Sequence, residues 1–191
     1  MNKIPFNHCF QLKSTTAKMS NNYHFRIATT DDAPRLQELI EAAFRFTDAS
    51  IEWIGSPELA ETFTMDMSVI NERIGSPDNV FLIASDTPDG TATACVNVYK
   101  KEPGYGRIAL LAVDPTIQRG GLGRVVMNKA EGYLMKEFGA KKIGLNALET
   151  RKGLIEWYER KGYARTGDVT KIPVERYEGK EITLVEFEKS V

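Results

Sequence analysis

Histidine and cysteine are scarce in this chain of 191 residues, which contains two of each. After Asn22 only His24 and Cys95 remain. A zinc site built from cysteine and histidine is therefore excluded from the main part of the chain, and no metal cofactor is expected. A Ser-His-Asp or Cys-His nucleophilic system is nearly excluded, because its imidazole would have to come from His24. The sequence predicts chemistry that proceeds without imidazole.

Long apolar runs, an excess of charge of one sign and closely spaced cysteines are also missing. No run approaches the roughly 18 apolar residues of a membrane-spanning helix, so no membrane partner is expected. The 25 Lys and Arg against 26 Asp and Glu lack the basic excess typical of a nucleic-acid-binding protein, so no nucleic-acid partner is expected either. Two cysteines far apart in the sequence fit a reducing compartment, and the cytoplasm is the expected location.

Acidic residues are absent from the first 30 positions. This composition has some likeness to an organelle transit peptide, but the only arginine there, Arg26, falls in the first expected strand. A disordered leader over residues 1–22, with Met19 as a second start, is the favoured interpretation. Residues 23–191 are expected to form one domain, since 42% of the chain is hydrophobic and the length suits a single core.

Gly, Pro and Asp divide residues 23–191 into strand and helix patterns. Pro34 lies in the first turn of a helix that is expected to run to about Arg45. Residues 46–76 are less periodic, with a second helical pattern near 59–74. The other expected elements are strands at 23–28, 80–85, 91–99, 107–113, 142–147 and 182–187, and helices after the glycines at 120–123 and over 154–161. This order predicts a mixed α/β domain.

A glycine-rich turn follows the apolar strand at 107–113, which is expected to be buried on both faces. Gly120 to Gly123 then open a helix whose first amides, at the positive end of the helix dipole, can bind an anion between Arg119 and Arg124. A simple helix-opening turn with solvated arginines explains the spacing about equally well. Neither a Walker loop nor a dinucleotide-binding fingerprint is indicated, because Gly-Lys-Ser/Thr and Gly-x-Gly-x-x-Gly are both absent.

The residues of this turn resemble a motif of a known family. Gln118-Arg119-Gly120-Gly121-Leu122-Gly123 matches Gln/Arg-x-x-Gly-x-Gly/Ala, the pyrophosphate motif of the GNAT superfamily of N-acetyltransferases. Leu-Ala-Val-Asp-Pro at 111–115 and Tyr-x-x-x-Gly-Tyr at 158–163 agree with its flanking motifs, and the similarity covers about residues 24–190. The resemblance implies a mixed, mostly antiparallel sheet flanked by helices, with a central parallel strand pair splayed to hold CoA.

Acetyl-CoA is the co-substrate that the resemblance implies, held between strands 107–113 and 142–147. Its pantetheine would pair with the backbone of the first strand, and its pyrophosphate would meet the amides of residues 119–124. Asn146 stands where the family often places a side-chain amide against the cofactor, although a turn-forming asparagine is an equal alternative. The expected cofactor-binding residues are Leu111, Ala112, Val113, Gln118, Arg119, Gly120, Gly121, Leu122, Gly123, Arg124 and Asn146.

Tyr158 is the expected catalytic residue, because the resemblance gives it the task of protonating the departing CoA thiolate. A phenol with a pKa of about 10 can do this within hydrogen-bond reach. The alternative is that Trp157 and Tyr158 form the core face of a helix. The implied reaction is direct attack of an amine on the thioester, with a backbone N–H near Leu111 stabilising the oxyanion.

The group that accepts the proton of the amine is left open. Many family members place a glutamate about where Arg107 stands here, so this sequence departs from the pattern. Asp48, Glu52 and Glu58, or a chain of water molecules, are the candidates. Each of these carboxylates also reads as an ordinary solvated loop residue.

The leading interpretation is an N-acetyltransferase that uses acetyl-CoA and a small-molecule amine, such as an amino acid, a polyamine or a xenobiotic amine. Two alternatives remain: a protein or peptide N-acetyltransferase, and a CoA-binding regulatory module without turnover. Trp53 is either an aromatic wall of the acceptor pocket or local packing, and Arg151 either binds an acceptor carboxylate or lies in solvent. A homodimer is a further expectation from the resemblance.

Overall fold

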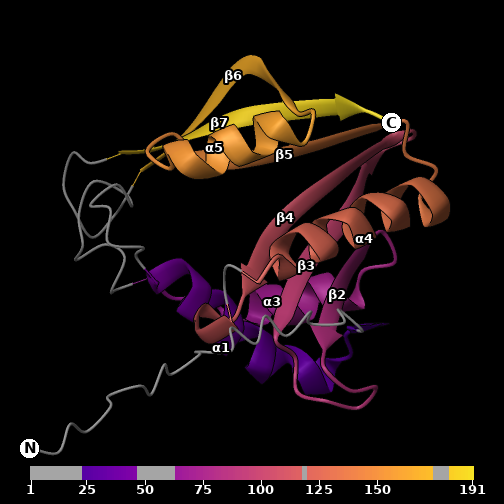
Figure 1. The fold of residues 1–191 in the computed structure, drawn as a ribbon. Helices are drawn as coiled ribbons and strands as arrows, with labels where there is room; N and C mark the ends of the chain where they lie inside the picture. The colour runs from indigo at the N-terminus through magenta and orange to yellow at the C-terminus, as the bar shows by residue number, and fades with distance from the viewer. Residues whose placement is uncertain (1–22, 47–62, 118–119, 174–180) are drawn as a thin grey trace, which may run out of the picture.

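The computed structural model describes residues 23–46, 63–117, 120–173 and 181–191, which form a mixed α/β fold (Figure 1). The expected leader at residues 1–22 lies outside the described residues. The elements are β1 (His24–Ile27), η1 (Thr30–Asp32), α1 (Ala33–Arg45), α3 (Met67–Gly75), β2 (Asn79–Ser85), β3 (Ala94–Glu102), β4 (Tyr105–Val113), η2 (Pro115–Ile117), α4 (Leu122–Glu137), β5 (Lys142–Leu148), α5 (Lys152–Arg160), β6 (Ala164–Pro173) and β7 (Glu181–Ser190).

Seven strands form one sheet in the order β1-β2-β3-β4-β5-β7-β6. Every neighbouring pair is antiparallel except β4 and β5, which run parallel. Their pairing joins residues 105–107 to residues 142–144 and goes no further, and beyond it the two strands diverge (Figure 1). The predicted fold class, a mostly antiparallel sheet with a splayed central parallel pair, is confirmed.

Helices cover both faces of the sheet and bury two separate apolar clusters. On one face α4 buries Val126, Ala130 and Leu134 against β3 and β4, with the helical spacing of three to four residues. On the other face α1 buries Leu36, and α3 buries Ile70. Burial of each large apolar side chain contributes about 1.5–3 kcal/mol, so both clusters stabilise the position of β4 between them.

A bulge interrupts β4 where β5 leaves it. The register with β3 shifts, so that Leu110 and Leu111 stand opposite a single residue of β3. Leu110 has a φ of 48°, a left-handed conformation that costs a leucine about 1–3 kcal/mol. The expectation that 107–113 is buried on both faces is wrong for residues 109–111 and for Val113, which are half-buried because β5 no longer covers them.

Several element boundaries differ from the sequence-based expectation, most clearly at the start of α3 and at both ends of β3. Residues 63–66, within the helical pattern predicted near 59–74, are not helical, and α3 begins at Met67. The reason is local, because the Asp66 side chain accepts a hydrogen bond from the Ser68 amide at 2.8 Å and caps the helix there. The strand predicted at 91–99 begins at Ala94 and continues to Glu102.

Gly144 of β5 allows the Tyr105 ring to lie against the sheet. A Cβ at this position would overlap the Tyr105 hydroxyl and would lie 3.0 Å from two ring carbons. Gly144→Ala should therefore lower the free energy of unfolding by about 1–3 kcal/mol, measured by urea denaturation. Gly132→Ala in α4, where an added Cβ meets no atom within 4 Å, should raise that free energy by up to about 1 kcal/mol. Equal effects of the two substitutions would contradict the packing described here.

Candidate active site

The divergence of β4 and β5 opens a cavity of about 460 Å³, called here the splay cavity. Its wall includes Ala109, Leu110 and Leu111 of β4, Asn146 and Leu148 of β5, and Tyr158 of α5. A cavity of this volume, with a mainly apolar wall and a few polar groups, is typical of a site for a small molecule.

A second cavity of about 550 Å³, called here the groove, runs from the start of α4 to α5. Its wall includes Val113, Leu122, Gly123, Trp157 and Arg160. The groove and the splay cavity have five residues in common, which are Phe44, Leu111, Arg151, Leu154 and Tyr158. The two cavities therefore meet, and Tyr158 lies at their junction.

Glycines shape the start of α4 at one end of the groove. Gly121 is the N-cap residue and has a φ of 84°, a conformation that L side chains rarely adopt. Its carbonyl accepts hydrogen bonds from Arg124 N at 3.1 Å and Val125 N at 3.3 Å, so the amides of Leu122 and Gly123 precede the hydrogen-bonded part of the helix. These amides and the positive end of the helix dipole have the geometry that an anion site requires.

The β-strand residues predicted to bind the cofactor lie around the two cavities. Leu111 lines both of them, Val113 lines the groove, and Asn146 lines the splay cavity. Ala112 points to the other face of the sheet, where its side chain is buried in the cluster under α1. Only the backbone of Ala112 is therefore placed to face the gap between β4 and β5.

The remaining predicted residues divide into two groups. Gly120 and Arg124 are exposed at the start of α4. The other candidates lie outside the described residues, and these are Gln118, Arg119, Asp48, Glu52, Trp53 and Glu58.

Tyr158 lies on the core face of its helix and also lines the two cavities. It is 6% exposed and packs against the rings of Trp157, Tyr163 and Phe187, so it belongs to the core face of α5. It also lines the groove and the splay cavity. Burial raises the pKa of Tyr158 to about 12, against a smaller opposing effect of the nearby Arg151 charge. The phenol therefore keeps its proton at neutral pH.

Arg151 begins α5 beside Tyr158 and lines both cavities, so the alternative that it simply lies in solvent is wrong. Burial lowers the pKa of Arg151, which the charge of Tyr158 partly opposes. A buried guanidinium at this junction could meet a negatively charged group of either substrate.

Arg107, at the position where the family often has a glutamate, faces a glutamate from another strand. Its Nη1 donates to Glu186 Oε2 of β7 at 2.7 Å, and Asn146 Nδ2 donates to Glu186 Oε1 at 3.3 Å. Sequence reasoning missed Glu186, because the register that sets it opposite Asn146 is a property of the β5–β7 pairing. The alternating pattern of the last strand was the only local signal that Glu186 lies on this face.

No group of three or more His, Cys, Asp or Glu side chains among the described residues is arranged to hold a metal ion. None of the helices in the described part of the chain is long and apolar enough to cross a membrane.

The chain belongs to the acetyltransferase (GNAT) family, because residues 36–163, more than half of its length, match that family. The family and the acetyltransferase class predicted from the sequence are thereby confirmed, with acetyl-CoA as the co-substrate.

Individual proteins resemble the chain over most of its length. It is 28% identical to S-(2-succino)cysteine N-acetyltransferase of Bacillus subtilis (strain 168) over 151 residues, which are 75% of this chain and 86% of the relative. Ribosomal-protein-S18-alanine N-acetyltransferase from Escherichia coli superposes with a TM-score of 0.67 at 15% identity, over 88% of this chain and 94% of that one. The structure of spermidine N-acetyltransferase from Vibrio cholerae, in complex with CoA and spermine, superposes with a TM-score of 0.65 at 14% identity. The superposition covers 88% of this chain and 95% of that one. The two solved structures share the fold.

Cys95 is placed where it has no part in this chemistry. It is fully buried under α1, on the face of β3 away from the groove, and burial raises the pKa of its thiol to about 12. At pH 8 only about one thiol in ten thousand is then the reactive thiolate. In a Cys9→Ser background, iodoacetamide should leave the native protein unmodified and should add one group after denaturation, as measured by intact mass. Modification of the native protein would contradict this burial.

Proposed function

We propose that this protein transfers the acetyl group of acetyl-CoA to the primary amine of a small molecule, by direct attack of the amine on the thioester in a ternary complex. One observation carries the proposal: the groove, which starts at the amides of α4, joins the splay cavity at Leu111 and Tyr158. A thioester bound along the groove would reach this junction from one side. An amine in the splay cavity would reach it from the other.

The cofactor would be held mainly by backbone groups. The pyrophosphate would accept hydrogen bonds from the amides at 120–124, where Gly121 and Gly123 leave room for it, together with the side chains of Gln118 and Arg119. The pantetheine would pair with the backbone of Leu111, Ala112 and Val113. This part of β4 supports the proposal, because β5 has left it and no strand among the described residues pairs with that edge beyond residue 107.

The bulge in β4 supports the proposed oxyanion site. Leu110 and Leu111 are not paired residue by residue with β3, and Leu111 lies at the junction of the two cavities. A backbone N–H that is held rigidly and lacks a strand partner is well suited to stabilise the negative charge that develops on the thioester oxygen. The amide near Leu111 is the group that we assign to this task.

Tyr158 would donate its proton to the sulfur of the departing CoA. The phenol lies at the junction and stays protonated at neutral pH, because burial raises its pKa to about 12. A thiolate held within hydrogen-bond distance takes up this proton as the C–S bond breaks, and the proton that the amine nitrogen loses to water as the C–N bond forms restores the phenol.

A small molecule is the acceptor that the cavities favour over a protein. The splay cavity, with about 460 Å³, has the volume of a small-molecule site. The relative from Bacillus subtilis is named for a small cysteine derivative, and the Vibrio cholerae structure contains spermine. The Escherichia coli enzyme is named for a protein acceptor, so a protein or peptide acceptor is the second candidate. Cytoplasmic location and a homodimer stay predictions.

Gly121→Glu tests the cofactor site, because it adds bulk and negative charge where the pyrophosphate is expected. Acetyl-CoA at about 100 times its Kd should stabilise the wild-type protein by ~2.7 kcal/mol, which raises the Tm by about 5–10 °C. Gly121→Glu should abolish this shift. Gly139→Glu is the matched control, since Gly139 also has a positive φ, of 62°, but follows the other end of α4. A full shift in the Gly121→Glu protein would refute the cofactor placement.

Tyr158→Phe tests the proton donor. The substitution should lower kcat for the best acceptor of an amine panel by about 10² or more, measured by release of free thiol, while the Tm shift with acetyl-CoA is retained. Tyr133→Phe is the control, because it removes a phenol hydroxyl of α4 that lines neither cavity. Wild-type turnover in Tyr158→Phe would remove Tyr158 from the mechanism. If no amine of the panel causes the wild-type protein to release thiol above background, the alternative of a CoA-binding regulatory module without turnover is favoured.

A further inference from the structure

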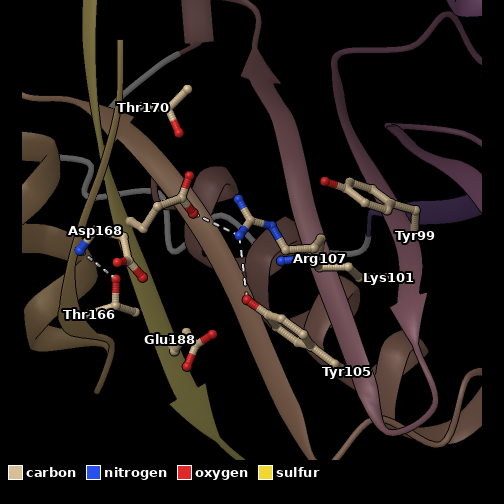
Figure 2. A pocket seen from close by; sticks show the side chains of 9 residues that line it. Tyr99, Lys101, Tyr105, Arg107, Thr166, Asp168, Thr170 and Glu188 are labelled. Carbon is tan, nitrogen blue, oxygen red and sulfur yellow. Dashed lines mark hydrogen bonds and ion pairs between the residues drawn. The ribbon is translucent and has the colours of Figure 1, made fainter.

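A third cavity, of about 500 Å³, lies on the sheet face that carries α1 and α3, and is called here the polar cavity (Figure 2). Polar side chains of β3, β4, β6 and β7 form its wall, with Arg107 at its centre. Tyr99 lines both the polar cavity and the splay cavity, so the two are neighbours. The function proposed above leaves the polar cavity without a role.

Figure 2 shows that the two sides of the polar cavity differ in charge. Lys101 and Arg107 come from the β3–β4 side, whereas Asp168, Glu186 and Glu188 come from the β6–β7 side. A cavity with both charges side by side is suited to a ligand that itself carries both charges.

The β6 side reaches over the cavity because the strand bulges. The register between β6 and β7 shifts between Arg165 and Val169, and Gly167 has a φ of 92°. The Thr166 hydroxyl accepts a hydrogen bond from Asp168 N at 3.1 Å, which holds the bulged backbone. Thr166 and Asp168 both line the cavity as a result.

Arg107 is 8% exposed and remains charged in this cavity. Its Nη1 donates to Glu186 Oε2 at 2.7 Å and to Tyr105 Oη at 3.4 Å. Burial alone would lower the pKa of Arg107, but the hydrogen bonds with Glu186 and Tyr105 hold it above the usual value. Arg107 reaches β7 past Gly144, its register partner on β5, which has no side chain in the way.

One edge of the Arg107 guanidinium has no acceptor. Nε is buried and has no hydrogen-bond partner among the described residues, and Nη2 makes no hydrogen bond to them either. A buried donor without an acceptor costs about 1–3 kcal/mol and is rare in folded proteins. Nε and Nη2 lie side by side in the planar guanidinium, which is the arrangement that binds a carboxylate through two parallel hydrogen bonds.

We infer that Arg107 recognises the carboxylate of the acceptor in the polar cavity while the amine of the acceptor enters the neighbouring splay cavity, so that the acceptor is an amine of the α-amino-acid type. This inference rests on the proposed function and names the substrate class for it. The carboxylate would accept a hydrogen bond from Nη2 of the guanidinium, beside the fully buried Nε.

Glu186 sets the position of the amine in this arrangement. One carboxylate oxygen of Glu186 faces Arg107, and the other accepts the hydrogen bond from Asn146, which lines the splay cavity. Glu186 therefore lies between Arg107 and the splay cavity. An α-amino acid has its ammonium next to its carboxylate. When its carboxylate binds Arg107, its ammonium would lie close to the carboxylate of Glu186, which is hydrogen-bonded to Arg107. Its amine then points toward the splay cavity, which Asn146 lines.

A polyamine fits the polar cavity less well. The acidic side chains of β6 and β7 would attract its ammonium groups, but Lys101 and Arg107 would repel them from the other side. A polyamine would also bring no carboxylate to the guanidinium of Arg107.

The inference is tested by equilibrium binding to the protein saturated with CoA, so that no turnover is needed. The probes are the standard α-amino acids and S-carboxymethylcysteine, the carboxamide of each, and 1,4-diaminobutane. At least one amino acid should bind at least about tenfold more tightly than its carboxamide, because only the acid pairs with Arg107. Arg107→Met should bring this ratio close to one.

A second variant guards against misfolding, because Arg107→Met leaves Glu186 without its main partner. Arg107→Gln combined with Glu186→Gln removes both charges together and should also lose the preference for the acid. Arg165→Met is the matched control, since Arg165 of β6 pairs with the exposed Glu159 at 3.1 Å and does not line the polar cavity. The Arg165→Met protein should bind the amino acid more tightly than its carboxamide by the same factor as the wild-type protein.

Four results would overturn the inference: equal binding of acid and carboxamide, tighter binding of the diamine, no binding of any amino acid, or an unchanged ratio in the double variant. Failure of the proposed function has a different signature, which is the absence of a Tm shift with acetyl-CoA. In that case the same titrations on the protein without CoA still decide whether Arg107 binds a carboxylate.

Discussion

The short parallel pairing of β4 with β5 is the constraint on which the other features of the site depend. It ends after Arg107 and Gly144, and from there the two strands separate. The separated strands are held by different elements, since α1 and α4 pack on the two faces of β4, while Ile155 and Tyr158 of α5 are buried together with Val185 and Phe187 of β7. The gap is therefore a property of the backbone and the core rather than of any single side chain.

The bulge in β4 belongs to the same constraint. Leu110 adopts a left-handed conformation at the point where β5 no longer pairs with β4, and packing on both sides of the strand offsets the cost of this conformation. The gap thus has an irregular backbone on one side and the buried phenol of Tyr158 near its centre. Both are held by residues far from the gap, so neither substrate has to create the site when it binds.

Features set by nearby residues could be predicted from the sequence. The glycine-led start of α4 follows from Gly120, Gly121 and Gly123, and the place of Tyr158 on the inner face of α5 follows from helical spacing. The β4 bulge could not be predicted, because it depends on the register with β3. Nor could the pair of Arg107 and Glu186, whose members are 79 positions apart and meet through two strand pairings. Arg107 alone was therefore interpreted as a loss of the family's glutamate, although the fold supplies a carboxylate from β7.

The groove and the polar cavity have no residue of their walls in common. The groove is lined by α4, α5, the end of β4 and the end of α1, and the polar cavity by β3, β4, β6 and β7. Substitutions in the bulged part of β6 can thus reshape one cavity without touching the amides that begin α4. Such a division would let evolution change the cavity proposed for the acceptor while the part of the fold proposed to hold acetyl-CoA stays the same.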